Sequence, residues 1–146
     1  MMKLRTRKFN NRHLSNILRF ATRFYLTQLN QHNSNVNVTI LQVPNLGADG
    51  TCEKVSNREF IIELNEDLGL EHRLITLAHE TVHIKQYLTK QLRTWHLKTG
   101  TIDIWEGKRF RNVNYFQQPW EAEALLIEEQ LYIDFVTECY AMGFRL

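Results

Sequence analysis

The chain has 146 residues, of which 43% are hydrophobic and 23% charged, and its formal net charge is +2. These values are typical of a single folded domain and argue against a disordered chain. No apolar run approaches the roughly 20 residues that span a bilayer, so we expect no membrane partner. The two cysteines, Cys52 and Cys139, lie far apart and in no metal-ligand spacing, which favours a reducing, cytoplasmic compartment.

Charge is distributed unevenly along the chain. We predict a basic tail over residues 1–12 and a single domain over residues 13–146. A basic arm of this kind can contact nucleic acid through phosphates, or act as a transit peptide. The simpler interpretation is a solvated helix that pairs with the acidic remainder of the domain. The first 48 residues contain no acidic residue, and their basic residues are Lys3, Arg5, Arg7, Lys8, Arg12, Arg19 and Arg23.

Hydrophobic periodicity predicts a helix and two strands in the first half of the chain. Apolar residues recur at helical spacing over residues 13–31, which indicates an N-terminal helix. Alternation over residues 36–43 predicts a strand that ends at the following proline. Residues 60–64 form a second, short apolar strand. The intervening segment 45–58 is rich in turn-forming residues and is predicted to be a loop or an irregular hairpin connection.

Two helices and a hairpin are predicted in the second half. A helix begins at about residue 68 or 71 and ends at residue 88. Residues 101–110 resemble a hairpin with Gly107 in its turn. The last helix begins at Pro119, where the missing N–H is tolerated, and ends near residue 142. This order of elements predicts an α+β domain with a small mixed or antiparallel sheet.

The segment His79-Glu80-Thr81-Val82-His83 is an H-E-x-x-H motif within the second predicted helix. Two histidines four residues apart project from one face of a helix, so both imidazoles can reach one metal ion. Zinc lowers the pKa of water towards neutrality, and Glu80 would accept the proton that this water releases. Because apolar residues flank the motif at helical spacing, we interpret it as the centre of a zinc hydrolase rather than as two unrelated histidines.

A catalytic zinc ion with two histidine ligands needs a third protein ligand and one position open to water. The last predicted helix offers three carboxylates, from Glu121, Glu123 and Glu128. Glu121 and Glu123 lie about 200° apart around the helix, so at most one of them faces the metal directly. Glu128 returns to the face of Glu121 and could also lie near the site. Spacing alone favours none of the three.

Three further segments accompany the motif. They are Lys85-Gln86-Tyr87, the predicted hairpin with Trp105 and Gly107, and Pro119-Trp120-Glu121-Ala122-Glu123-Ala124. In this combination, over about residues 60–130, the chain resembles the small phage-type zinc metallopeptidases of the gluzincin superfamily. These are similar in pattern to the minimal gluzincins and, more distantly, to SprT-like proteins.

The resemblance implies a zincin-like fold, Zn²⁺ as the cofactor and a glutamate ligand on the helix that follows the motif. In several of these families a small residue follows that glutamate at the third position. Glu121 with Ala124 matches this pattern, so the predicted metal ligands are His79, His83 and Glu121, with Glu123 in reserve. Related membrane-type gluzincins have an aspartate four residues after the ligand to support the first histidine. Leu125 stands there in this chain, so that support has to come from another residue.

We therefore predict a zinc-dependent peptidase, encoded by a phage or prophage, that hydrolyses a protein or peptide substrate in the host cytoplasm. Glu80 would act as general base towards water and then as acid towards the leaving amine. A donor side chain would stabilise the tetrahedral oxyanion together with zinc. Tyr115, six residues before the predicted ligand, is the leading candidate for that donor, ahead of His96, Arg109 and Arg111.

The strand at residues 60–64 is predicted to form the upper edge of the cleft, where an extended substrate could add as a further strand. Two other functions are consistent with the sequence. One is a non-enzymatic binding module that zinc stabilises and that contacts nucleic acid through the basic N-terminal region; the intact Glu80 argues against it. The other is hydrolysis of a non-protein amide, which would require export. Aromatic residues that either line pockets or form the core are Trp95, Trp105, Tyr115, Phe116 and Trp120.

Overall fold

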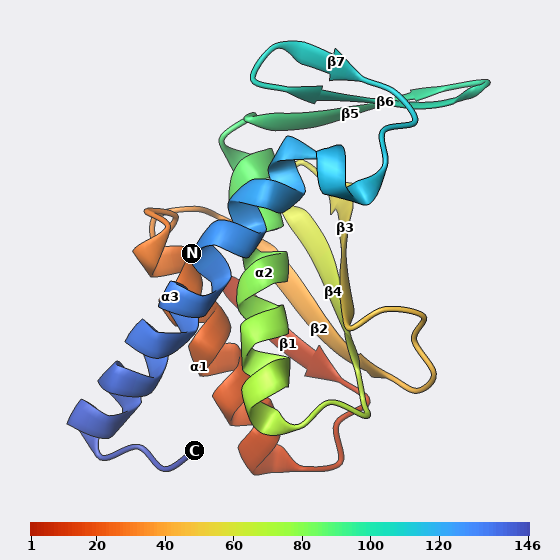
Figure 1. Cartoon of the computed structure of the whole chain (residues 1–146). Helices are drawn as coiled ribbons and strands as arrows, with labels where there is room; N and C mark the ends of the chain where they lie inside the picture. The colour runs from red at the N-terminus through yellow and green to blue at the C-terminus, as the bar shows by residue number, and fades with distance from the viewer.

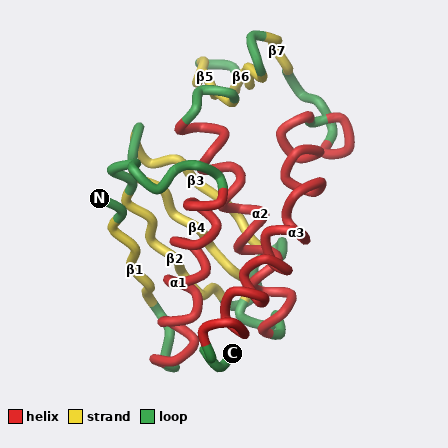
Figure 2. The backbone as a smooth tube through the Cα atoms, turned by 90° about the vertical axis from the view of Figure 1, so that its left-hand side faces the viewer, coloured by secondary structure: helices red, strands yellow, loops and turns green.

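The computed structural model describes residues 1–146 and has an α+β fold with three α-helices and two sheets. Helices α1 and α2 cover one face of the larger sheet, and α3 packs against these two helices (Figures 1 and 2). The smaller sheet lies beyond the C-terminal end of α2 (Figure 1). The elements are β1 (Lys3–Arg7), α1 (Arg12–Gln28), β2 (Asn37–Val43), β3 (Gly50–Ser56), β4 (Glu59–Asn65), α2 (Leu70–Leu88), β5 (Leu92–Leu97), β6 (Gly100–Trp105), β7 (Lys108–Phe110), the 3-10 helix η1 (Tyr115–Gln117) and α3 (Pro119–Met142).

The larger sheet has the strand order β1-β2-β4-β3. Strand β2 is parallel to both β1 and β4, whereas β3 is antiparallel to β4. Apolar side chains alternate along the strands, and the buried set, including Ile40, Phe60 and Ile62, faces the helices. The mixed sheet that the sequence predicts is therefore present.

The prediction that residues 60–64 form the edge of the cleft is wrong. They belong to β4, which pairs with β2 on one side and with β3 on the other. The edge strand is β3, which lies in the segment predicted to be a loop or an irregular connection. Its sequence is mostly polar and exposed, so hydrophobic alternation could not identify it; pairing with β4 makes it a strand.

The N-terminal tail prediction is also wrong for residues 3–7, which form β1. Lys3, Arg5 and Arg7 are exposed on one face of this strand, while Leu4 packs against the core on the other. Basic residues that alternate with only Leu4 and Thr6 give a weak strand signal, so β1 is fixed by its parallel pairing with β2. The first helix begins close to its predicted start but ends at Gln28, and Asn30 beyond it adopts a left-handed φ of 62°.

A core of 21 buried residues joins the sheet to all three helices. Phe135 of α3 contacts the rings of Phe20, Phe24 and Tyr25 on α1 at centroid distances of 5.3–5.7 Å. The Tyr25 hydroxyl donates a hydrogen bond of 3.0 Å to the carbonyl of Leu74 on α2. These contacts fix the rotation of α3 relative to α2, which decides which side chains of α3 face the H-E-x-x-H motif.

The second half of the chain follows the sequence prediction closely. Helix α3 begins at Pro119 and ends before Gly143, which adopts a left-handed φ of 69°. Strands β6 and β7 form the predicted hairpin, and β5 adds a third strand that the sequence did not reveal. None of the helices has the length and mean hydropathy needed to cross a bilayer.

Candidate metal centre

The structure brings together the three residues predicted to bind the metal. His79 and His83 lie one turn apart on α2, and Glu121 lies in the first turn of α3. Each offers one ligand atom, and these atoms lie within 4.8 Å of one another. The Nε2 atom of His79 is 2.8 Å from one Glu121 oxygen, and Nε2 of His83 is 3.2 Å from the other. This group could hold a metal ion.

Electrostatics at the site favour a bound cation. Burial would raise the pKa of Glu121, but hydrogen bonds from His79 and His83 and their positive charge hold it well below its usual range. Burial also lowers the pKa of His79, yet bonds to Glu121 and Glu128 outweigh it and raise that pKa to about 9. Without a metal, protons on the imidazoles compensate the carboxylates. A divalent cation held by the same atoms would take over that role.

The first histidine has a carboxylate partner on its other nitrogen. Nδ1 of His79 lies 2.7 Å from an oxygen of Glu128, which stands two turns after Glu121 on α3. Such a bond orients the ring and directs Nε2 towards the metal position. Glu128 thus supplies the support that the sequence lacks at Leu125, and it acts as a partner of a ligand rather than as a ligand.

We expect the Glu128→Gln substitution to weaken the binding of a metal ion at this group by roughly 10–100-fold, because it keeps the side-chain shape but removes the charge that holds His79. The dissociation constant is measured by competition with a chromophoric chelator. Glu129→Gln is the matched control, since the adjacent Glu129 is exposed. Equal affinities in the two variants would show that Glu128 does not support the site.

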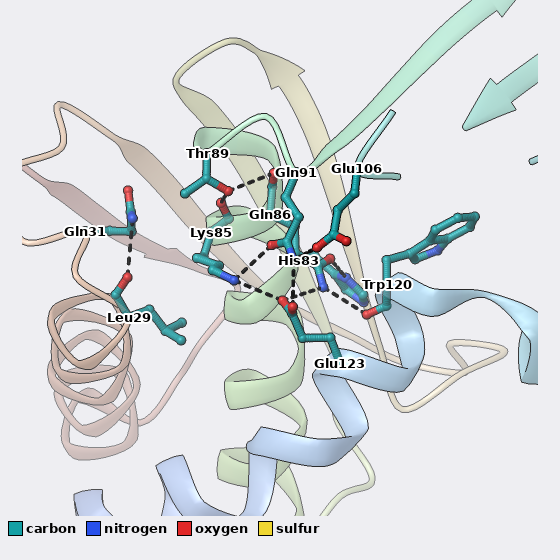
Figure 3. A network of polar contacts seen from close by, with 10 residues as sticks. All are labelled: Leu29, Gln31, His83, Lys85, Gln86, Thr89, Gln91, Glu106, Trp120 and Glu123. Carbon is teal, nitrogen blue, oxygen red and sulfur yellow. Dashed lines mark hydrogen bonds and ion pairs between the residues drawn. The ribbon is translucent and has the colours of Figure 1, made fainter. Parts of the chain in front are cut away.

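The second histidine is held by a different network, shown in Figure 3. Nδ1 of His83 lies 2.9 Å from Oε1 of Gln86, and the amide oxygen accepts a hydrogen bond from the Nδ1–H group. The amide nitrogen of Gln86 donates to the carbonyl of Trp120 at 2.9 Å and to Glu123 at 3.2 Å. Glu123 also accepts from Lys85 at 3.0 Å, as part of an ion pair. The structure therefore places Glu123 in the support of His83 and not among the metal ligands.

The three candidate ligands line a cavity of about 610 Å³, and Glu80 forms part of the same wall. Burial raises the pKa of the Glu80 carboxyl, an effect that positive charge on His83 and His79 partly offsets. The hydrogen bonds and ion pairs of the site join the histidines to Glu121, Glu128 and Gln86 and leave Glu80 out. A carboxylate that faces an open cavity with a raised pKa is suited to accept a proton from a substrate or water.

The edge strand β3 lies close against the motif helix because of Gly50. A β-carbon at Gly50 would lie 2.6 Å from Cγ2 of Thr76 and 3.3 Å from Cγ of Glu80. Thr76 is buried, and its branched side chain has little freedom to move away. Glycine therefore allows β3 to form one wall of the cavity beside Glu80. An isolated glycine in a predicted loop carried no signal of this role.

Gly50→Ala is expected to lower the free energy of unfolding by about 1–3 kcal/mol, because the added methyl group overpacks the contact between β3 and α2. Gly47→Ala is the control, since a β-carbon there meets no atom within 4 Å. Urea unfolding of both variants, followed by circular dichroism, measures the difference. Identical stabilities would mean that β3 can shift without cost.

Among the predicted oxyanion donors, the structure places only Tyr115 at the cavity. It lies on η1, and its side chain is 46% exposed. Burial, and after it the negative charge of Glu121, raises the pKa of Tyr115 to about 12, so its hydroxyl keeps its proton. Arg109 stacks on Trp95 of the smaller sheet, and Arg111 donates to Thr99. Neither arginine lines the cavity, and neither does the third alternative, His96.

The aromatic residues of the second half divide between several environments. Trp105 and Trp120 are buried together with Leu92 in a small cluster between the smaller sheet and the start of α3, and Trp120 also lines the cavity. Trp95 and Phe116 are exposed, at 47% and 92%. The basic residues of the first 48 positions lie on or next to β1 and α1, and none lines the cavity. Contact between this region and nucleic acid stays a prediction.

The chain was compared with known proteins at the levels of sequence and structure. No protein-family model matches it, and no curated protein or solved structure shows significant similarity. The resemblance to gluzincin-type metallopeptidases therefore rests on the sequence motifs, and the function has to be argued from the geometry of the site.

Proposed function

We propose that this protein is a zinc-dependent peptidase with a zincin-like fold. The observation that carries the proposal is the convergence of ligand atoms from His79, His83 and Glu121 within 4.8 Å, beside Glu80 on the wall of the same cavity. Two imidazoles and one carboxylate form a ligand set typical of catalytic zinc, which keeps one position open. A zinc ion that only stabilises a fold usually has four protein ligands, and this group has three.

Bound zinc would supply Lewis acidity, which polarises a carbonyl group and makes water more acidic. Glu80 accepts the proton of the attacking water and passes it to the leaving amine. Tyr115 keeps its phenolic proton and donates a hydrogen bond to the oxygen on which negative charge develops. Glu128 and Gln86 hold the two imidazoles in orientation through their Nδ1 atoms.

The shape of the cavity favours an extended peptide as substrate. Residues Gly50–Cys52 of β3 line it, and β3 has a free edge because it pairs only with β4. A peptide can add to such an edge through main-chain hydrogen bonds, which do not depend on its sequence. Pockets beside the edge then select among its side chains. We therefore assign to β3 the role of cleft edge that the sequence predicts for residues 60–64.

Metal analysis and a peptide library test the proposal together. The purified protein should retain about one zinc ion per chain after dialysis. Digestion of a proteome-derived peptide library, read by mass spectrometry, should show cleavage that EDTA abolishes and added zinc restores. Cleavage that persists in EDTA would identify a contaminating protease, and a dialysed protein free of zinc would contradict the proposal.

A further inference from the structure

The cavity continues past the metal centre to a second group of residues, here called the Asp103 subsite: Tyr87, Leu92, Asp103 and Trp120. Tyr87 follows His83 by four residues on α2, so it lies one turn further along the same face. Leu92 and Trp120 pack together, and Tyr87 packs against them. The subsite therefore has apolar and aromatic walls.

Asp103 contributes a carboxylate without a cationic partner. One of its oxygens accepts a hydrogen bond of 2.7 Å from the Thr94 hydroxyl, and Asp103 takes part in none of the ion pairs of the protein. None of the 19 residues that line the cavity is a lysine or an arginine. One cation lies beside the subsite, because Nζ of Lys54 is 5.5 Å from the centre of the Tyr87 ring, but it forms no ion pair with Asp103. The Asp103 carboxylate therefore stays available to a cationic ligand.

The other carboxylates of the cavity already have partners or a role. Glu121 and Glu128 contact His79, and Glu80 lies beside the metal ligands. Asp49, which immediately precedes β3, forms an ion pair of 2.9 Å with His72. Even with a divalent cation at the metal centre, the cavity keeps an excess of negative charge. Asp103 carries the part of that charge that lies among the apolar residues of the subsite.

We infer that the Asp103 subsite binds the side chain of a lysine or arginine next to the scissile bond, so that the substrates are basic peptides. The inference rests on the proposed function. The aliphatic part of a basic side chain packs on Leu92 and Trp120, and the Asp103 carboxylate pairs with its cationic head. Tyr87 lies one helical turn, about 5.4 Å, beyond His83. One or two residues of an extended peptide span that distance, which places the bound basic residue next to the scissile bond.

Binding of small zinc-directed ligands tests the subsite without turnover. The probes are the hydroxamates of lysine, norleucine and glutamate, measured by calorimetry on the zinc-loaded protein. Lysine and norleucine have side chains of similar length but differ in charge. We expect the lysine compound to bind about tenfold more tightly than the norleucine compound, and the glutamate compound to bind most weakly.

Substitution of Asp103 assigns this preference to its carboxylate. In Asp103→Asn the lysine and norleucine compounds should bind equally, and in Asp103→Lys the glutamate compound should bind more tightly than the lysine compound. Glu106→Gln is the control, because it removes one negative charge from the same hairpin at a position that does not line the cavity. This control should keep the wild-type preference.

The outcomes separate this inference from the proposed function. Lysine preference without cleavage of any library peptide would support the subsite and contradict the peptidase. Zinc-dependent cleavage with no enrichment of lysine or arginine, together with equal binding of the lysine and norleucine compounds, would overturn the subsite alone. A protein that retains no zinc would overturn both.

Discussion

Glu80→Gln should keep its zinc and lose roughly 10²–10⁴-fold of its kcat for peptide hydrolysis. Glutamine has the size of glutamate but cannot accept the proton of the attacking water. The metal ligands are unchanged, because Glu80 takes part in none of the hydrogen bonds that orient His79, His83 or Glu121. Zinc content by elemental analysis and initial rates on a cleaved library peptide measure the two effects separately.

The matched control is Glu71→Gln, which removes a carboxylate from the first turn of the same helix at an exposed position. It should show the wild-type rate. A Glu80→Gln variant that hydrolyses peptides at the wild-type rate would exclude Glu80 as the base. Loss of zinc from Glu80→Gln would instead make Glu80 a metal ligand and require a different mechanism.

Glu121→Ala should lose its zinc on dialysis, whereas Glu123→Ala should retain it. Removal of Glu121 leaves two histidines and no ligand from α3, so the fall in affinity should exceed the roughly 10–100-fold effect typical of residues that only support ligands. Glu123 instead holds Lys85, Gln86 and Gln91. Its loss should lower the free energy of unfolding by about 1–3 kcal/mol, because each of these three donors loses one acceptor and Lys85 loses its ion pair.

Elemental analysis after dialysis and thermal unfolding of both variants give the two readouts. Each variant is compared in zinc-saturated and zinc-free buffer, so that loss of metal is distinguished from loss of fold. The wild-type protein should gain stability from zinc, and Glu123→Ala should gain a comparable amount. Zinc retained by Glu121→Ala but lost by Glu123→Ala would contradict the assignment of the third ligand.

Local sequence patterns predicted the helices that carry the site. The spacing of His79 and His83 and the start of α3 at Pro119 both follow from signals within a few residues, such as helical periodicity and the tolerance of proline in a first turn. The hairpin of β6 and β7 was predicted for the same reason, from the Glu106-Gly107 turn between two short segments.

Strand identity was less accessible, because it depends on partners that are distant along the chain. Strand β1 pairs with β2 across the whole of α1, and the mostly polar β3 becomes an edge strand through β4. Considered without their pairing partners, the sequences of β1 and β3 cannot be distinguished from those of a tail and a loop. The error about the cleft edge follows directly from the missed β3 strand.

By itself, the sequence identified the candidate ligands of this protein: two histidines beside a glutamate in one motif, and three carboxylates on a later helix from which a third ligand could come. The tertiary structure decided between those carboxylates. Packing of Phe135 against α1 sets the rotation of α3, which turns Glu121 to the histidines, Glu128 behind His79 and Glu123 to Lys85. Helical spacing fixes which residues share a face, but only contacts between helices fix where that face points.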